Sequence, residues 1–154
     1  MSTILTYPDV FLREISQEVK LPLSQEDKLL INRMKDTMYQ KKGVGLAAIQ
    51  IGYQKRIAVM DTSGSKSQSI TLINPKIINQ SDLTVIGEEG CLSAPGQFAD
   101  VPRQTRIKVE YVCEHGKKLS KTFYDIKAIV IQHEIDHMNG KLCLDYRPTL
   151  KREK

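Results

Sequence analysis

The sequence lacks the features that mark membrane, secreted and disulfide-stabilised proteins. An apolar run at residues 128–131 is far shorter than the ~20 residues that cross a bilayer. The first residues contain neither a basic segment nor a long apolar stretch, so no signal peptide is expected. Three widely spaced cysteines do not fit a disulfide framework. We therefore expect a soluble protein of a bacterial-type cytoplasm, with an organellar or viral origin left open.

Recognised nucleotide-binding and DNA-binding motifs are also absent. The sequence contains no zinc finger, no P-loop and no dinucleotide fingerprint, and its net charge of +5 is mild and spread out. The densest basic cluster is at the end of the chain, at Lys151, Arg152 and Lys154. We interpret it as a solvated terminus, with weak contact to an RNA-rich surface such as the ribosome as the alternative. We expect no DNA or membrane partner, and we expect the protein to be a monomer.

The N-terminal part predicts one amphipathic helix over residues 24–42. Ser24 can cap its first turn, and Asp27 three residues later resembles a capping box. Apolar side chains recur on one face at Leu30, Met34 and Met38. Gly43 is the expected stop.

The rest of the chain predicts strands followed by a second helix. Strands are expected at 56–61, 70–77, 85–88, 105–112 and 121–124, with a polar loop at 63–67. Residues 125–139 form an apolar segment that predicts a buried helix ending at Gly140. We expect one α+β domain over residues 1–154, in which antiparallel or mixed sheets pack around the buried C-terminal helix and an N-terminal helix completes the core.

A metal-binding pattern lies in that second helix. His133 and His137 are four residues apart and project from the same helix face, so both imidazoles can reach one ion. Glu134 lies beside the first histidine and can act on a water whose pKa the metal lowers toward about 7. The motif contains two of the three histidines of the chain. It predicts a metal-assisted hydrolase of amide-type bonds.

A hydrolytic metal site needs a third protein ligand and an open position. Downstream, Cys143 falls where the longer metzincin pattern has its third histidine, but the segment after it contains no methionine for the turn of those proteases. Upstream, Cys91 lies in the tight segment 89–95, whereas Cys113, two residues before His115, is interpreted as a small apolar residue at a strand end. From the residues alone, the ligand is either an upstream residue or Cys143.

Three segments resemble the signature motifs of the peptide deformylase family. They are residues 43–50 (GVGLAAIQ), 89–93 (EGCLS) and 132–137 (QHEIDH), in the family order, and the similarity covers roughly residues 3–146. The resemblance implies a hydrolase that removes the formyl group from the N-terminal methionine of nascent polypeptides and releases formate. It also implies one divalent metal ion held by Cys91, His133 and His137. The ion expected in the cell is Fe²⁺, for which Zn²⁺, Ni²⁺ or Co²⁺ can substitute.

The resemblance further assigns roles around the metal. Glu134 moves the proton, and the Gln50 side-chain amide and the Leu92 backbone N–H stabilise the oxyanion. The implied substrate-binding residues are Val44, Gly45, Glu89, Gly90, Ile126, Ile129, Val130 and His133. Gly45 is expected to bind an extended peptide through its backbone. The methionine pocket is expected to be lined by Val44, Ile126, Ile129 and Val130.

Three residues depart from the family pattern, and two other functions remain alternatives. Phe98 stands where some members have arginine, Lys127 where leucine is frequent, and Cys143 where an apolar residue is frequent. An HExxH metalloendopeptidase is the main alternative, and a non-catalytic metal-binding protein is the other.

Overall fold

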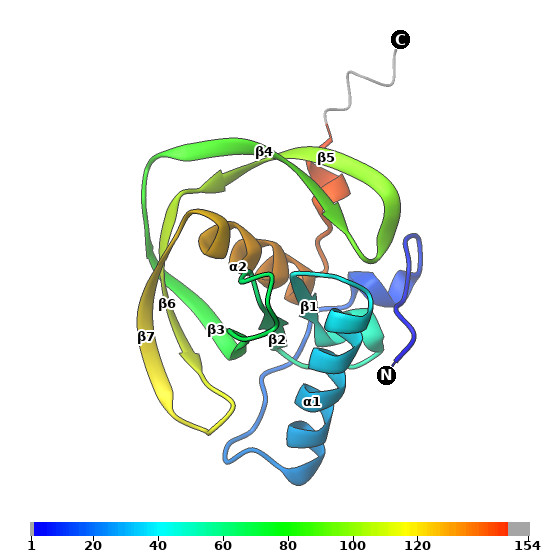
Figure 1. Ribbon diagram of the computed structural model, residues 1–154, viewed down its shortest axis with the longest axis vertical. Coiled ribbons are helices and arrows are strands. Elements are labelled where there is room, and N and C mark those ends of the chain that lie inside the picture. The colour runs from blue at the N-terminus through cyan, green and yellow to red at the C-terminus, as the bar shows by residue number, and fades with distance from the viewer. Residues whose placement is uncertain (1, 148–154) are drawn as a thin grey trace.

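The computed structural model describes residues 2–147, which form two antiparallel sheets and two α-helices (Figure 1). The α-helices are α1 (Gln25–Gln40) and α2 (Asp125–Met138), and the chain also forms short 3-10 helices η1 (Val10–Arg13), η2 (Ala48–Ile51) and η3 (Cys143–Tyr146). The strands are β1 (Gly45–Ala47), β2 (Ile57–Met60), β3 (Ile70–Gln80), β4 (Thr84–Cys91), β5 (Ala94–Gln104), β6 (Arg106–Val112) and β7 (Lys118–Tyr124). The predicted α+β class is confirmed.

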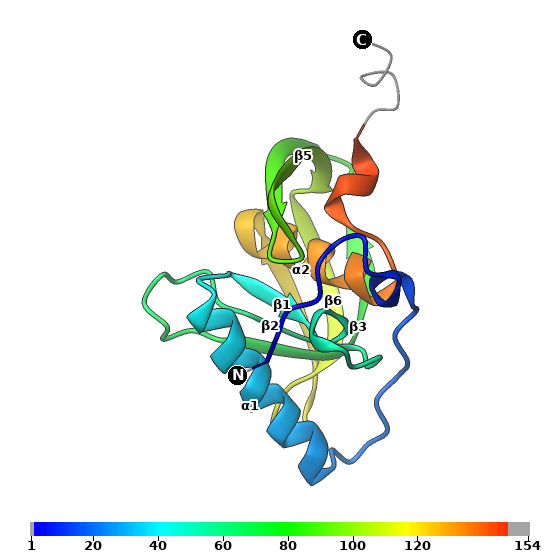
Figure 2. The ribbon, with the colours of Figure 1, turned by 90° about the vertical axis from the view of Figure 1, so that its right-hand side faces the viewer.

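The five-stranded sheet has the order β1-β2-β3-β6-β7, and β4 and β5 form a separate two-stranded sheet. Helix α2 contacts β1, β2, β6 and β7 of the larger sheet and β5 of the smaller one. In Figures 1 and 2 it runs through the middle of the molecule, with β4 and β5 curving past it. This position places its polar residues between the two sheets.

Helix α1 packs against β1 and β2 through its apolar stripe. The predicted capping box is present, because the Ser24 side chain accepts from the Asp27 N–H and the Asp27 carboxylate accepts from the Ser24 N–H. The predicted stop at Gly43 is wrong by one residue. Lys42 adopts the left-handed conformation, with φ of 58°, and the Gly43 N–H then donates to the Met38 carbonyl.

The predicted strands are all found, most of them longer than expected, but β1 and β5 were not predicted. Strand β1 has only three residues and adjoins a glycine-rich turn, so no alternation is visible in it. Strand β5 contains Pro95, Gly96 and Pro102, residues that weaken a strand assignment. Its hydrogen bonds with β4 override these local preferences. Among the described residues, no helix is long and apolar enough to cross a membrane.

Candidate metal centre and active site

Three potential metal ligands from β4 and α2 meet at one point. The Cys91 Sγ lies 3.3 Å from the His137 Nε2, which lies 3.2 Å from the His133 Nε2. All three ligand atoms lie within 4.8 Å of one another. Within residues 2–147, they are the one such group of three His, Cys, Asp or Glu side chains. The structure thus brings together the residues that the sequence proposes as ligands.

Local structure explains how these side chains meet. Cys91 is the last residue of β4 and pairs with Ala94 across the two-residue turn at Leu92 and Ser93. A register shift between Glu89 and Cys91 interrupts the regular ladder just before the turn. Both histidines project from one face of α2, which is fixed by buried apolar residues on its other faces.

The donor set fits a divalent transition metal. One thiol and two imidazoles suit zinc, iron, nickel or cobalt, and His137 is fully buried. The Nδ1 of His133 lies 2.9 Å from the Glu89 Oε1, which favours a proton on Nδ1 and leaves Nε2 as the ligand atom. Beside the ligands, the Glu134 Oε1 is buried and has no hydrogen-bond partner among the described residues. A free carboxylate oxygen at this place is available to water or substrate.

A buried ionic network contacts the Nδ1 side of the His133 ring through Glu89. The Arg103 guanidinium, only 3% exposed, donates two hydrogen bonds of 2.9 Å to the two oxygens of Glu89. Its Nη1 also donates to the Asp136 Oδ2 at 2.7 Å, and the Tyr146 hydroxyl donates to the same oxygen at 2.7 Å. Each buried charge therefore has partners, which offsets its desolvation.

This network and burial set the protonation of the carboxylates. Burial disfavours the charged form of Glu89, but hydrogen bonds from Arg103 and His133 outweigh it and lower its pKa to about 2. Burial raises the pKa of Glu134 to about 7, although the positive charges of His133 and Arg103 oppose the rise. Glu134 therefore exchanges protons readily near neutral pH.

The two imidazoles differ in their proton affinity. Burial, together with the nearby positive charges of His133 and Arg103, lowers the pKa of His137 well below its ordinary value. Burial acts in the same direction at His133, but hydrogen bonds to Cys91 and Glu89 raise its pKa well above the ordinary value. Since a ligating imidazole nitrogen cannot hold a proton, a metal ion that bound at His133 would have to displace one.

Gln50 lies close to Cys91, and Gly45 lies close to Glu134. The Gln50 side chain is buried; its Nε2 donates to the Ser93 Oγ at 3.0 Å and lies 3.6 Å from the Cys91 Sγ, and its Oε1 accepts from the Ala47 N–H. This amide is therefore held in one orientation beside the ligands. A Cβ on Gly45 would lie 2.5 Å from the Glu134 Oε2, so glycine permits close approach of strand and carboxylate.

One cavity of about 580 Å³ opens onto these residues. Its lining includes every proposed site residue except His137, which is buried beneath it. The residues proposed for the methionine pocket, Val44, Ile126, Ile129 and Val130, all belong to this lining. Phe98 also lines the cavity, and its ring lies against Gly90. The cavity has the mixed polar and apolar lining of a ligand site.

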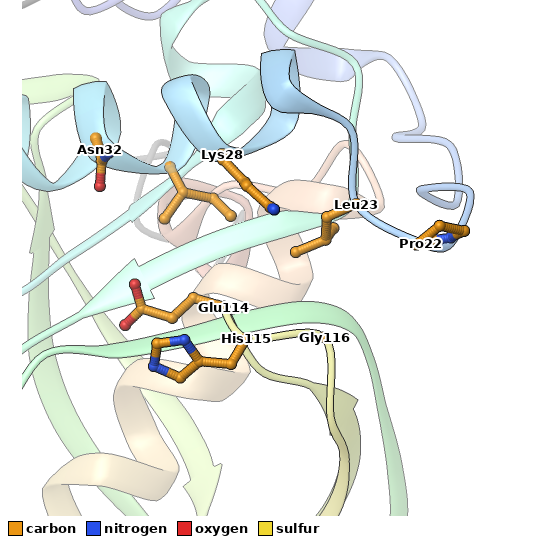
Figure 3. Close-up of a pocket in the computed structure, with 8 residues that line it drawn as sticks. Pro22, Leu23, Lys28, Asn32, Glu114, His115 and Gly116 are labelled. Atoms are coloured by element: carbon orange, nitrogen blue, oxygen red, sulfur yellow. The ribbon is translucent and has the colours of Figure 1, made fainter.

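Of the competing cysteines, Cys143 packs near Cys91, whereas Cys113 lies elsewhere. Cys143 is buried in an apolar cluster with Ala94 and Leu144, and it is not part of the ligand group. Cys113 packs against the core beneath α2. Its neighbour His115 lines a separate cavity of about 430 Å³ beside α1, where Figure 3 shows it next to Glu114. Glu114 is paired there with Lys35 at 2.8 Å, so this cavity offers no comparable metal site.

Sequence reasoning missed four contributors, Ser93, Arg103, Asp136 and Tyr146. Arg103 lies in a strand that was not predicted, so its burial could not be anticipated. Asp136 lies three residues after His133, which places it near the same helix face, and this spacing was the one available signal. Ser93 and Tyr146 reach the site through a turn and a 3-10 helix that the pattern does not reveal.

Comparisons with known proteins, by sequence and by fold, point to one family. A family model described as polypeptide deformylase matches residues 1–153. The peptide deformylase of Pelagibacter ubique (strain HTCC1062) is 45% identical over 154 residues, covering 99% of this chain and 89% of that protein. The crystal structure of a peptide deformylase from Legionella pneumophila matches with a TM-score of 0.93 at 42% identity, covering 99% of this chain and 89% of that one. A probable peptide deformylase from synechococcus phage S-SSM7 gives a TM-score of 0.89 at 37% identity, covering 95% of this chain and 99% of that one. This chain therefore belongs to the polypeptide deformylase family.

Proposed function

We propose that this chain hydrolyses the formyl group from the N-terminal formyl-methionine of nascent polypeptides and releases formate. The observation that carries the proposal is the joint placement of Cys91, His133 and His137 around one point, with Glu134 beside them in the same cavity. Membership of the deformylase family gives this arrangement its reaction.

The family is metal-dependent, and the ligand group is suited to a single divalent ion. We propose that Cys91, His133 and His137 hold Fe²⁺ in the cell, and that Zn²⁺, Ni²⁺ or Co²⁺ can replace it. When bound, the ion supplies a Lewis acid that polarises the formyl carbonyl and lowers the pKa of water. Glu89, supported by Arg103, orients the His133 ring for this task.

Glu134 is proposed as the proton carrier. With a pKa near 7 it can accept a proton from the attacking water and then deliver it to the leaving amine. The fixed Gln50 amide and the Leu92 backbone N–H are proposed to donate to the oxygen of the tetrahedral intermediate. Gln50 is already held beside Cys91 by Ser93 and Ala47, so little reorganisation is needed.

The cavity provides for the peptide. We propose that Val44, Ile126, Ile129 and Val130 contact the methionine side chain, since all four line the cavity near Glu134. Gly45, Glu89, Gly90 and His133 are proposed to complete the substrate site. Gly45 and Gly90 lack side chains where the backbone of an extended peptide would approach.

We further propose that residues 1–154 act as one catalytic domain, as a monomer, in a bacterial-type cytoplasm. The basic cluster at residues 151–154, considered for weak ribosome contact, lies outside the described residues. Ribosome contact remains a proposal that rests on charge alone.

Formate release tests the function. Protein prepared without oxygen and loaded with Fe²⁺ is incubated with a formyl-Met peptide and, separately, with peptides blocked at both ends. We expect formate from the first and no internal cleavage of the second. Cleavage of the blocked peptides without formate release would favour a metalloendopeptidase and contradict the proposal.

A further inference from the structure

Tyr146 connects the segment that follows α2 to the metal centre. It belongs to η3, and its half-buried hydroxyl donates to the Asp136 Oδ2 at 2.7 Å. Its ring lies close to two cations, with the Arg103 guanidinium carbon 5.0 Å and the Lys141 Nζ 4.5 Å from the ring centre. These contacts fix the hydroxyl toward Asp136.

From Asp136 the contacts continue to a metal ligand. The same Oδ2 accepts from the Arg103 Nη1, and Arg103 also binds both oxygens of Glu89. Glu89 in turn lies 2.9 Å from the Nδ1 of His133. One guanidinium is thus shared by two carboxylates, one of which holds the ligand ring.

We propose that Tyr146 is a positioning residue for the metal centre, which slows loss of the ion by keeping Arg103 engaged with Glu89. This inference rests on the proposed metal ligands, and the residue acts through Asp136, Arg103 and Glu89 without touching substrate.

Competition for Arg103 is the physical reason. The Tyr146 hydroxyl satisfies part of the negative charge of Asp136. Without it, Arg103 is the one side chain of residues 2–147 that donates a hydrogen bond to the Asp136 carboxylate, which then attracts the guanidinium more strongly, at the expense of its two bonds to Glu89. Glu89 then holds the His133 ring less firmly, and the ring swings away from the ion more often.

The test compares two tyrosines in the same kind of contact. Tyr146→Phe removes the hydroxyl at the metal centre. Tyr39→Phe is the matched control, because the Tyr39 hydroxyl donates to the Asp61 Oδ2 at 2.6 Å and neither residue lines the cavity. Zinc-loaded wild type and both variants are mixed with excess chelator that changes absorbance on binding zinc, and the release rate is recorded with the unfolding temperature.

We expect Tyr146→Phe to release zinc about 10-fold faster than wild type, at the lower end of the effect of residues that support metal ligands. Tyr39→Phe should release zinc within about 2-fold of wild type, even where its unfolding temperature falls equally. Equal release rates for Tyr146→Phe and wild type would overturn the inference, as would equal acceleration by both variants.

A second variant tests whether the effect of Tyr146 passes through Asp136. Asp136→Asn keeps the shape of the side chain but removes the charge that competes for Arg103, so Tyr146→Phe in this background should add less than about 2-fold to the release rate. A full additional 10-fold effect would contradict the relay through Asp136. If wild type and Cys91→Ser bind zinc equally well, the proposed ligand set itself fails, which is a different outcome from both.

Discussion

The two halves of this molecule are held together by different interactions. Around α1, β1 and β2, buried Leu, Ile, Val and Met side chains form a continuous apolar core. Around β4, β5 and the end of α2, the buried contacts include Glu89, Arg103, Asp136 and His133. In the first half, apolar burial contributes stability. In the second half, buried polar groups hold the side chains of the candidate site in place. Substitutions should therefore separate stability from metal binding and catalysis.

The largest expected effect is loss of the metal from Cys91→Ser. The thiolate is one of three proposed ligands, so its removal should leave less than stoichiometric metal after gel filtration, as measured by elemental analysis. Cys143→Ser, a change of the same chemistry in an apolar cluster, should keep the metal. Metal loss from Cys143→Ser alone would show that the ligand assignment is wrong.

Met38→Ala should lower the stability of the protein without changing its catalytic activity. Met38 is fully buried in the core beneath α1, so the truncation should lower the free energy of unfolding by about 2–5 kcal/mol in urea denaturation. Formate release per folded, metal-loaded molecule should stay within about 2-fold of wild type. A large loss of specific activity at full folding would show that the two halves are coupled.

Gln50→Ala should lower the rate of formate release and leave the metal content unchanged. Loss of one oxyanion donor typically raises the barrier by about 2.7–4 kcal/mol, which lowers kcat about 10²–10³-fold. Metal content should be retained, because Gln50 is not among the ligands. Unchanged kcat would remove Gln50 from the proposed site.

The smallest effect concerns acid stability in the α1 half. Burial opposes ionisation of Asp61, but hydrogen bonds from Ser63 and Tyr39 outweigh it and lower its pKa to about 2. A depressed pKa contributes stability above the unfolded value of about 4, and that contribution is lost as the pH falls toward 2. Asp61→Asn should therefore reduce the difference in unfolding temperature between pH 6 and pH 3. An unchanged difference would assign acid sensitivity to other carboxylates.

The sequence predicted the features that depend on local pattern. The apolar stripe and capping box located α1, alternation located β6, and the i, i+4 spacing placed His133 and His137 on one helix face. The resemblance to deformylases then selected Cys91 over Cys143, a choice that local spacing had left open.

Features that depend on tertiary contacts could not be predicted from the sequence. Strand β5 exists because β4 pairs with it, in spite of two prolines. Arg103 looks like a surface residue in the sequence and becomes buried because Glu89 and Asp136 satisfy its donors. Tyr146 acquires its contact with Asp136 only when η3 packs against β4 and β5.

The central claim is that Glu134 carries protons beside a metal that Cys91, His133 and His137 hold. The most direct measurement determines metal content and formate release on the same anaerobic preparation of Glu134→Gln and of wild type. We expect one equivalent of metal in both and formate release at least about 10²-fold slower in the variant. Formate release at the wild-type rate by metal-loaded Glu134→Gln would contradict this account.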